Sequence, residues 1–114
     1  MLTRSMMCAF VLVAGVAATA AAQDAKATKG AQLYADQKCS LCHSVGDKGN
    51  KKGPLDAVGS KLSPAELRAW IVDAKGMTVK TKAKAPRKPE MKNYDLPKDD
   101  VDALVAYMAT LKTK

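Results

Sequence analysis

The sequence predicts an all-α domain in which three to four short helices are joined by long loops. Two segments repeat apolar residues at helical spacing, one that follows Ser63 and one that runs from about Pro97 to Leu111. No segment shows the alternation of β-branched and polar residues that is typical of a half-buried strand. Residues 44–60 contain several glycines and a proline that break regular structure, so this stretch is predicted to be a loop.

The first 22 residues are predicted to be a secretory signal peptide, and residues 23–114 a single domain. Arg4 precedes an uncharged run, Met6–Ala22, which ends in three alanines before Gln23. A basic start, an apolar middle and small residues before a cleavage point are typical of such peptides, which predicts cleavage after Ala22 and a periplasmic protein. An uncleaved membrane anchor is the alternative, because the run lies at the lower edge of the about 17–25 residues that span a membrane.

The helix after Ser63 has a clear start signal. Serine caps a helix, proline is favoured in the first turn, and a glutamate three residues after the cap completes a capping box, as in Ser63-Pro64-Ala65-Glu66. Its apolar positions are Leu67, Trp70, Ile71 and Ala74. The helix is expected to end near Lys75-Gly76, where a basic residue and a glycine suit a helix C-terminus.

The other segments are less strongly patterned. An irregular start is expected at 23–28, followed by a short helix at Lys29–Lys38. Met77–Lys92 has no periodicity and is predicted to be a loop. The last helix follows Pro97, and its apolar face comprises Val101, Leu104, Val105, Met108 and Leu111.

The motif Cys39-Ser40-Leu41-Cys42-His43 carries the most specific chemical signal. Cys-x-x-Cys-His is the haem attachment pattern of c-type cytochromes, in which two thiols bond the haem vinyl groups and the imidazole ligates the iron. A zinc site would need further ligands, since residues 23–114 contain only these two cysteines and this histidine. A thioredoxin-like pair would need a strand–helix context, and a surface disulfide would leave His43 unexplained.

Residues 29–111 resemble a class I monohaem cytochrome c. Gly30 and Tyr34 precede Cys39 as in the first helix of that family, Gly53-Pro54-Leu55 is similar to a segment after its haem motif, and Tyr107 occupies the last helix. The resemblance implies a cytochrome c-like fold wrapped around one covalently bound haem. It also implies that Gly30 lets the first and last helices cross closely, and that the Pro54 carbonyl accepts the second ring N–H of His43.

The sixth iron ligand has three thioether candidates. Met108 belongs to the apolar face of the last helix and is expected to pack in the core. Met91 precedes the last helix, where the resemblance places the axial methionine, whereas Met77 would require a sharp reversal after the preceding helix. Met91 is therefore the predicted ligand, with Met77 as the alternative. Methionine at this position closes the iron to substrates and favours electron transfer over catalysis.

Three further residues are predicted near the haem. Trp70 is expected to serve as a core residue that also contacts the haem, and the resemblance implies that its indole can bond a haem propionate. Tyr94 is expected to line the pocket beside Met91. Asn93 is expected to donate a hydrogen bond to the methionine sulfur.

Charge and composition limit the classes of partner that this protein is expected to have. The formal net charge is +8, and the segment Lys80–Lys92 is rich in lysine and arginine, so it is predicted to dock redox proteins with acidic surfaces. Nucleic-acid binding is not expected, because aromatic side chains for base stacking are scarce. The same charge is compatible with transient contact with an anionic membrane surface. The aromatic scarcity, with a single phenylalanine at Phe10 in the leader, also indicates that the haem fills the core.

These observations predict a monomeric, exported one-electron carrier rather than an enzyme. The alternatives are a haem-bearing electron-transfer subunit of an oxidoreductase complex and a peroxidase-like haem enzyme. A gas-binding four-helix cytochrome is disfavoured by the position of the motif, because in that class the motif lies near the C-terminus.

Overall fold

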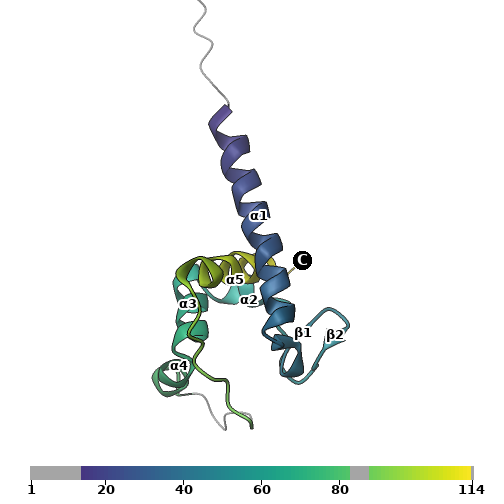
Figure 1. Ribbon diagram of the computed structural model, residues 1–114. Coiled ribbons are helices and arrows are strands. Elements are labelled where there is room, and N and C mark those ends of the chain that lie inside the picture. Colours follow the sequence, from purple (N-terminus) through teal and green to yellow (C-terminus); the bar gives the residue numbers. More distant parts are fainter. Residues whose placement is uncertain (1–13, 83–87, 114) are drawn as a thin grey trace, which may run out of the picture.

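The computed structural model describes residues 14–82 and 88–113 and confirms a predominantly α-helical fold (Figure 1). The α-helices are α1 (Ala14–Asp36), α2 (Val58–Lys61), α3 (Pro64–Val72), α4 (Ala74–Lys80) and α5 (Lys98–Thr110). A short 3₁₀ helix, η1, covers Cys39–Leu41, and a small hairpin pairs β1 (Ser44–Val45) with β2 (Lys48–Gly49). Within the described part of the chain, no helix is long and apolar enough to cross a membrane.

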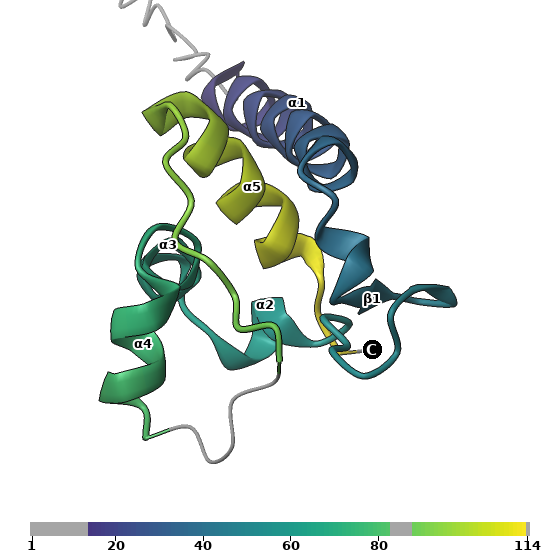
Figure 2. The ribbon, with the colours of Figure 1, turned by 60° about the horizontal axis from the view of Figure 1, so that its bottom comes forward.

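Helices α1 and α5 cross in close contact, as Figures 1 and 2 show from two directions. Gly30 lies at the crossing, where a Cβ atom would be only 2.0 Å from the Ala103 carbonyl oxygen and 2.6 Å from Tyr107 Cβ. The rings of Tyr34 and Tyr107 meet edge to face beside it, with centroids 5.7 Å apart. Glycine is therefore required here for backbone proximity, which confirms the role expected for Gly30.

Helix α3 begins where the sequence predicts. The Ser63 hydroxyl accepts a hydrogen bond from the Glu66 N–H, and the Glu66 carboxylate accepts one from the Ser63 N–H, which completes the capping box. Arg68 on α3 is paired with Asp102 on α5, and Lys98 bonds the other Asp102 oxygen at 2.8 Å. The buried core comprises Tyr34, Leu67, Ile71, Val101, Leu104, Val105 and Met108.

Two predicted boundaries are wrong. Residues 23–28 belong to the continuous helix α1 rather than to an irregular start, because alanine-rich sequence has high helix propensity. Helix α3 ends at Val72, and Met77 lies in α4, not in a loop. Asp73 caps α4 by accepting the Gly76 N–H at 3.1 Å, so Gly76 lies inside a second helix instead of ending the first.

The predicted signal peptide falls largely on residues 1–13, which lie outside the described residues. The described helix α1 includes the predicted cleavage point after Ala22. The segment 44–60 is mostly irregular, as predicted, apart from the hairpin and α2. Gly59 in α2 donates its N–H to the Leu111 carbonyl at 2.7 Å, which fixes α2 against the end of α5.

Candidate cofactor site

An apolar cavity of about 790 Å³ lies among η1, α2, α3, α4, α5 and the segment that precedes α5. This volume falls within the range of about 300–1,000 Å³ that is usual for cofactor sites. Its aliphatic lining residues are Leu41, Leu55, Val58, Leu62, Leu67, Ile71, Leu104 and Met108. The predicted site residues that line it are Cys39, Cys42, His43, Trp70, Met91 and Tyr94.

The motif residues are presented by a tight turn after α1. Lys38 adopts a left-handed conformation with φ of 57°, which ends the helix and starts η1. The N–H groups of Cys42 and His43 both bond the Cys39 carbonyl oxygen, at 3.1 and 2.9 Å. The two thiols and the imidazole are therefore held on one turn at the cavity wall. Burial raises the pKa of the Cys39 thiol, which favours its neutral form.

A backbone carbonyl fixes the orientation of the His43 imidazole, but it is a different carbonyl from the one that the resemblance implied. His43 Nδ1 lies 3.0 Å from the carbonyl oxygen of Gly53, not of Pro54. Pro54 forms an isolated parallel bridge with Ser44, and the Ser44 N–H donates to Gly53 O at 3.1 Å. This pairing places the Gly53 carbonyl beside Nδ1 of the imidazole, so Nε2 is the ring nitrogen that would ligate a metal.

Two side chains support the same turn. The Tyr34 hydroxyl donates to the His43 carbonyl at 3.4 Å, and burial is the largest cause that raises the pKa of Tyr34 to about 12. The Asn50 amide donates to the Leu41 carbonyl at 3.0 Å. Leu41 lines the cavity and is 69% exposed, so the turn lies where the cavity meets solvent.

The methionines occupy three different environments. Met91 lines the cavity and is half-buried, on the segment between α4 and α5. Met108 lines the cavity from α5 and is also part of the buried core. Met77 is only 8% exposed in α4 and is not among the described residues that line the cavity.

Asn93 does not serve the role expected for it. Its side-chain oxygen accepts the Lys75 N–H at 3.0 Å, and its amide lies 3.5 Å from an Asp73 oxygen. The amide is therefore engaged by the start of α4 and not by a methionine sulfur. Thr78 and Gln37 also line the cavity and were not anticipated, because neither belongs to a motif or an apolar repeat.

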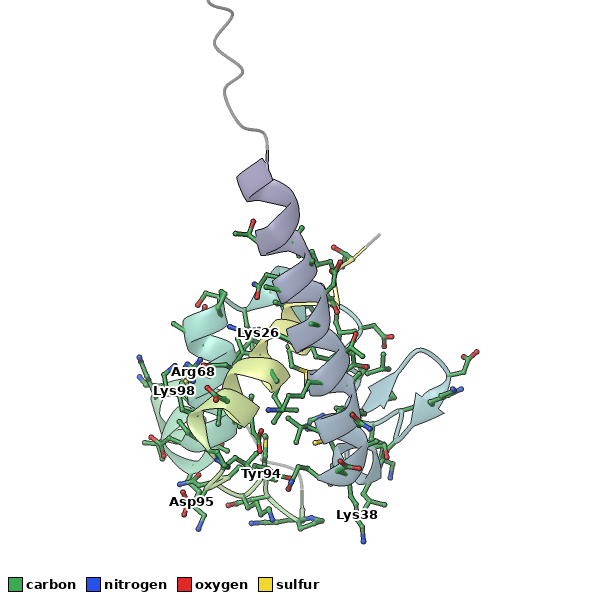
Figure 3. All side chains as sticks on the ribbon, turned by 45° about the horizontal axis from the view of Figure 1, so that its top comes forward. Lys26, Lys38, Arg68, Tyr94, Asp95 and Lys98 are labelled. Atoms are coloured by element: carbon green, nitrogen blue, oxygen red, sulfur yellow. The ribbon has the colours of Figure 1, made fainter. Side chains whose placement is uncertain are left out.

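Basic side chains lie at the cavity. Lys38 and Lys92 are exposed and belong to its lining, and Lys92 Nζ sits 4.7 Å from the centre of the Tyr94 ring. Lys38 and Tyr94 come from different segments, and both lie toward the lower end of Figure 3. Lys80, Lys82 and Lys88 are also exposed, whereas Lys84 and Arg87 of the predicted docking segment lie outside the described residues.

The residues present fit a covalently attached haem. Two thiols three positions apart, an imidazole with a fixed orientation and a thioether share one cavity with apolar walls. The described residues offer no cluster of three or more histidine, cysteine or acidic side chains for a metal ion alone. The donor set is therefore that of a thioether-linked haem iron rather than of a zinc site.

Comparisons with known proteins agree with this geometry. The family model described as "Cytochrome c" matches residues 27–112. The chain is also 30% identical over 95 residues to a "Cytochrome c oxidase subunit 2" from Alkalihalophilus pseudofirmus, an alignment that covers 75% of this chain and 26% of that protein. The chain thus spans about a quarter of the length of this relative, and no solved structure matches it. Residues 27–112 belong to the cytochrome c family, which binds haem covalently and transfers electrons.

Proposed function

We propose that this protein is an exported one-electron carrier in which His43 and Met91 are the axial ligands of the haem iron. The observation that carries the proposal is the lining of a single cavity by Cys39, Cys42, His43 and Met91. The competing methionine, Met77, is buried in α4 away from this lining among the described residues.

The chain's own residues would make the site suited to electron transfer. The haem supplies a reversible one-electron couple, and a histidine–methionine pair raises its potential. Gly53 fixes the imidazole ring, and the aliphatic walls would give the haem a mostly apolar environment. With both axial positions filled by side chains, no site is left for a substrate on the iron.

Export is the second part of the proposal. The run from Met6 to Ala22 with its alanine-rich end supports a cleaved leader, and covalent haem attachment to thiols suits a compartment outside the cytoplasm. Sequencing the N-terminus of the mature holoprotein tests it. A first residue at Gln23 is expected, and a retained Met1 would contradict cleavage.

The ligand assignment is tested by absorption spectra of the holoprotein. A methionine bonded to ferric haem iron gives a weak far-red band, and Met91→Ala should abolish it. Met77→Ala and Met108→Ala are matched controls that remove a thioether elsewhere and should retain the band. Retention in Met91→Ala with loss in either control would transfer the role to that methionine.

Docking through the basic segment is the third part. The exposed Lys80, Lys82, Lys88 and Lys92 support an encounter surface for an acidic redox partner, since opposite charges accelerate association at low salt. The reduction rate by an acidic donor protein should fall with ionic strength. Lys82→Glu should flatten this dependence, while Lys112→Glu, which lies outside the segment Lys80–Lys92, should change it less. A rate independent of salt would contradict steering.

A second function has one observation in its favour. The oxidase subunit to which the chain is similar suggests a haem-bearing module that donates electrons within a larger complex. Gel filtration of natively expressed protein separates the two functions. A carrier elutes as a free monomer, whereas a subunit elutes with its complex. A peroxidase-like enzyme would instead bind carbon monoxide at an open sixth position in the ferrous state.

A further inference from the structure

The segment that carries Met91 has no regular structure of its own. Residues 88–97 lead directly into α5, and in Figures 1 and 2 they pass beside α3. The Tyr94 N–H donates to the Ile71 carbonyl at 2.9 Å, which joins this segment to the last turn of α3. The position of Met91 therefore depends on contacts made by its neighbours in sequence.

Asn93 makes the side-chain part of this attachment. Its Oδ1 accepts the Lys75 N–H at 3.0 Å, an amide in the first turn of α4 that has no partner within the helix. Its Nδ2 lies 3.5 Å from Asp73 Oδ1, the same oxygen that accepts the Gly76 N–H. Both side chains therefore accept hydrogen bonds from the first turn of α4: Asn93 from the Lys75 N–H, and Asp73 from the Gly76 N–H.

Gly76 makes room for this arrangement. A Cβ atom at this position would lie 2.1 Å from Asp73 Oδ2, so any larger residue would displace the carboxylate. The capping carboxylate, the Asn93 amide and the start of α4 form one small polar cluster at the corner between α3 and α4. Met91 lies two residues from Asn93, no more than about 7 Å along an extended chain.

We propose that Asn93 is a positioning residue that holds Met91 at the iron, by fastening the segment 88–97 to the corner between α3 and α4. This inference rests on the proposed assignment of Met91 as a ligand. Cys39, Cys42 and His43 would hold the haem from one turn, whereas Met91 would reach the iron from a segment without regular structure. The strength of the methionine–iron bond then depends on how far the segment is preorganised.

Imidazole binding to the ferric holoprotein measures this directly, because imidazole must displace the sixth ligand. Asn93→Ala removes the contact with α4 and should raise the apparent affinity for imidazole by roughly three- to tenfold, the range expected for one net hydrogen bond. The far-red band should disappear at correspondingly lower imidazole concentration. Asp73→Ala, which removes the other half of the cluster, should act in the same direction and provides a second variant if Asn93→Ala does not fold.

Asn50→Ala is the matched control. Asn50 also fixes a loop through its side-chain amide, but on the haem-motif side. It should lower the thermal midpoint without changing imidazole affinity. If the wild type, Asn93→Ala and Asp73→Ala bind imidazole with equal affinity, and Met91→Ala loses the far-red band, this inference is wrong but the ligand assignment stands. Survival of the band in Met91→Ala would overturn the ligand assignment and this inference with it.

Discussion

The two walls of the haem cavity are built in different ways. The wall that carries Cys39, Cys42 and His43 is a tight turn supported by α1, the hairpin and the Gly53 carbonyl. The wall that carries Met91 is an extended segment attached to α3 and α4 through Tyr94 and Asn93. The motif wall is fixed by its own short-range geometry, whereas the methionine wall depends on long-range contacts. Disturbances of the fold should therefore appear first in the methionine ligand.

The largest expected effect comes from removing the covalent links on the motif wall. Cys39→Ser with Cys42→Ser should yield protein without haem on a denaturing gel stained for peroxidase activity. Leaving an aliphatic cavity of about 790 Å³ empty or filling it with water is unfavourable in free energy. The apoprotein should therefore be poorly ordered, as measured by circular dichroism. Single replacement of Cys42 is the control, since one thioether should retain haem. A tightly folded apoprotein would contradict the view that haem forms the core.

The next effect concerns the helix crossing that supports the motif wall. Gly30→Ala would place a methyl group against the Ala103 carbonyl and Tyr107, and should destabilise the holoprotein by about 1–3 kcal/mol in denaturant unfolding. Gln32→Ala, an exposed position on the same helix, should be close to neutral. If Gly30→Ala matched this control, the close approach of α1 and α5 would not be required.

The smallest effect concerns the partly buried ion pair of Asp102 between α3 and α5, which lies outside the lining of the haem cavity. Hydrogen bonds from Lys98 and Arg68 lower the pKa of Asp102 from 3.8 to about 2. A lowered pKa means that the ionised form stabilises the fold above pH about 4, and that this contribution is lost as the pH falls towards 2.

Asp102→Asn should therefore be slightly less stable than the wild type at pH 6, and the difference should shrink below pH 4. Unfolding by urea at several pH values measures it. Lys88→Gln is a suitable control, because Lys88 pairs with Glu90 within one exposed segment and joins no two helices. A difference for Asp102→Asn that is unchanged between pH 6 and pH 2 would contradict the assignment.

The strongest local signals were predictable from the sequence. The capping box at Ser63 and the apolar repeat of α5 are short-range patterns, and the structure places both as expected. The motif at Cys39 to His43 identifies the cofactor without any tertiary information. The close approach at Gly30 was also expected, although only through the resemblance to a known family.

The misses have a common physical cause. Helix α4 has only seven residues and is defined by the Asp73 cap and the burial of Ala74 and Met77, which no periodicity reveals. The choice of Gly53 over Pro54 depends on a backbone pairing with Ser44, and the engagement of Asn93 by α4 depends on a contact across 18 residues. Each depends on which backbone and side-chain groups meet in the folded chain, and sequence periodicity does not show this.

The Gly53 carbonyl has a consequence for protein engineering. It receives both the His43 imidazole and the Ser44 N–H, so the ring orientation is set at the two ends of the turn and not by its tip. Asp47 is exposed at the tip of the hairpin between β1 and β2, and lengthening a surface turn costs little free energy. A peptide tag or a second redox module could be inserted there while the iron environment is preserved.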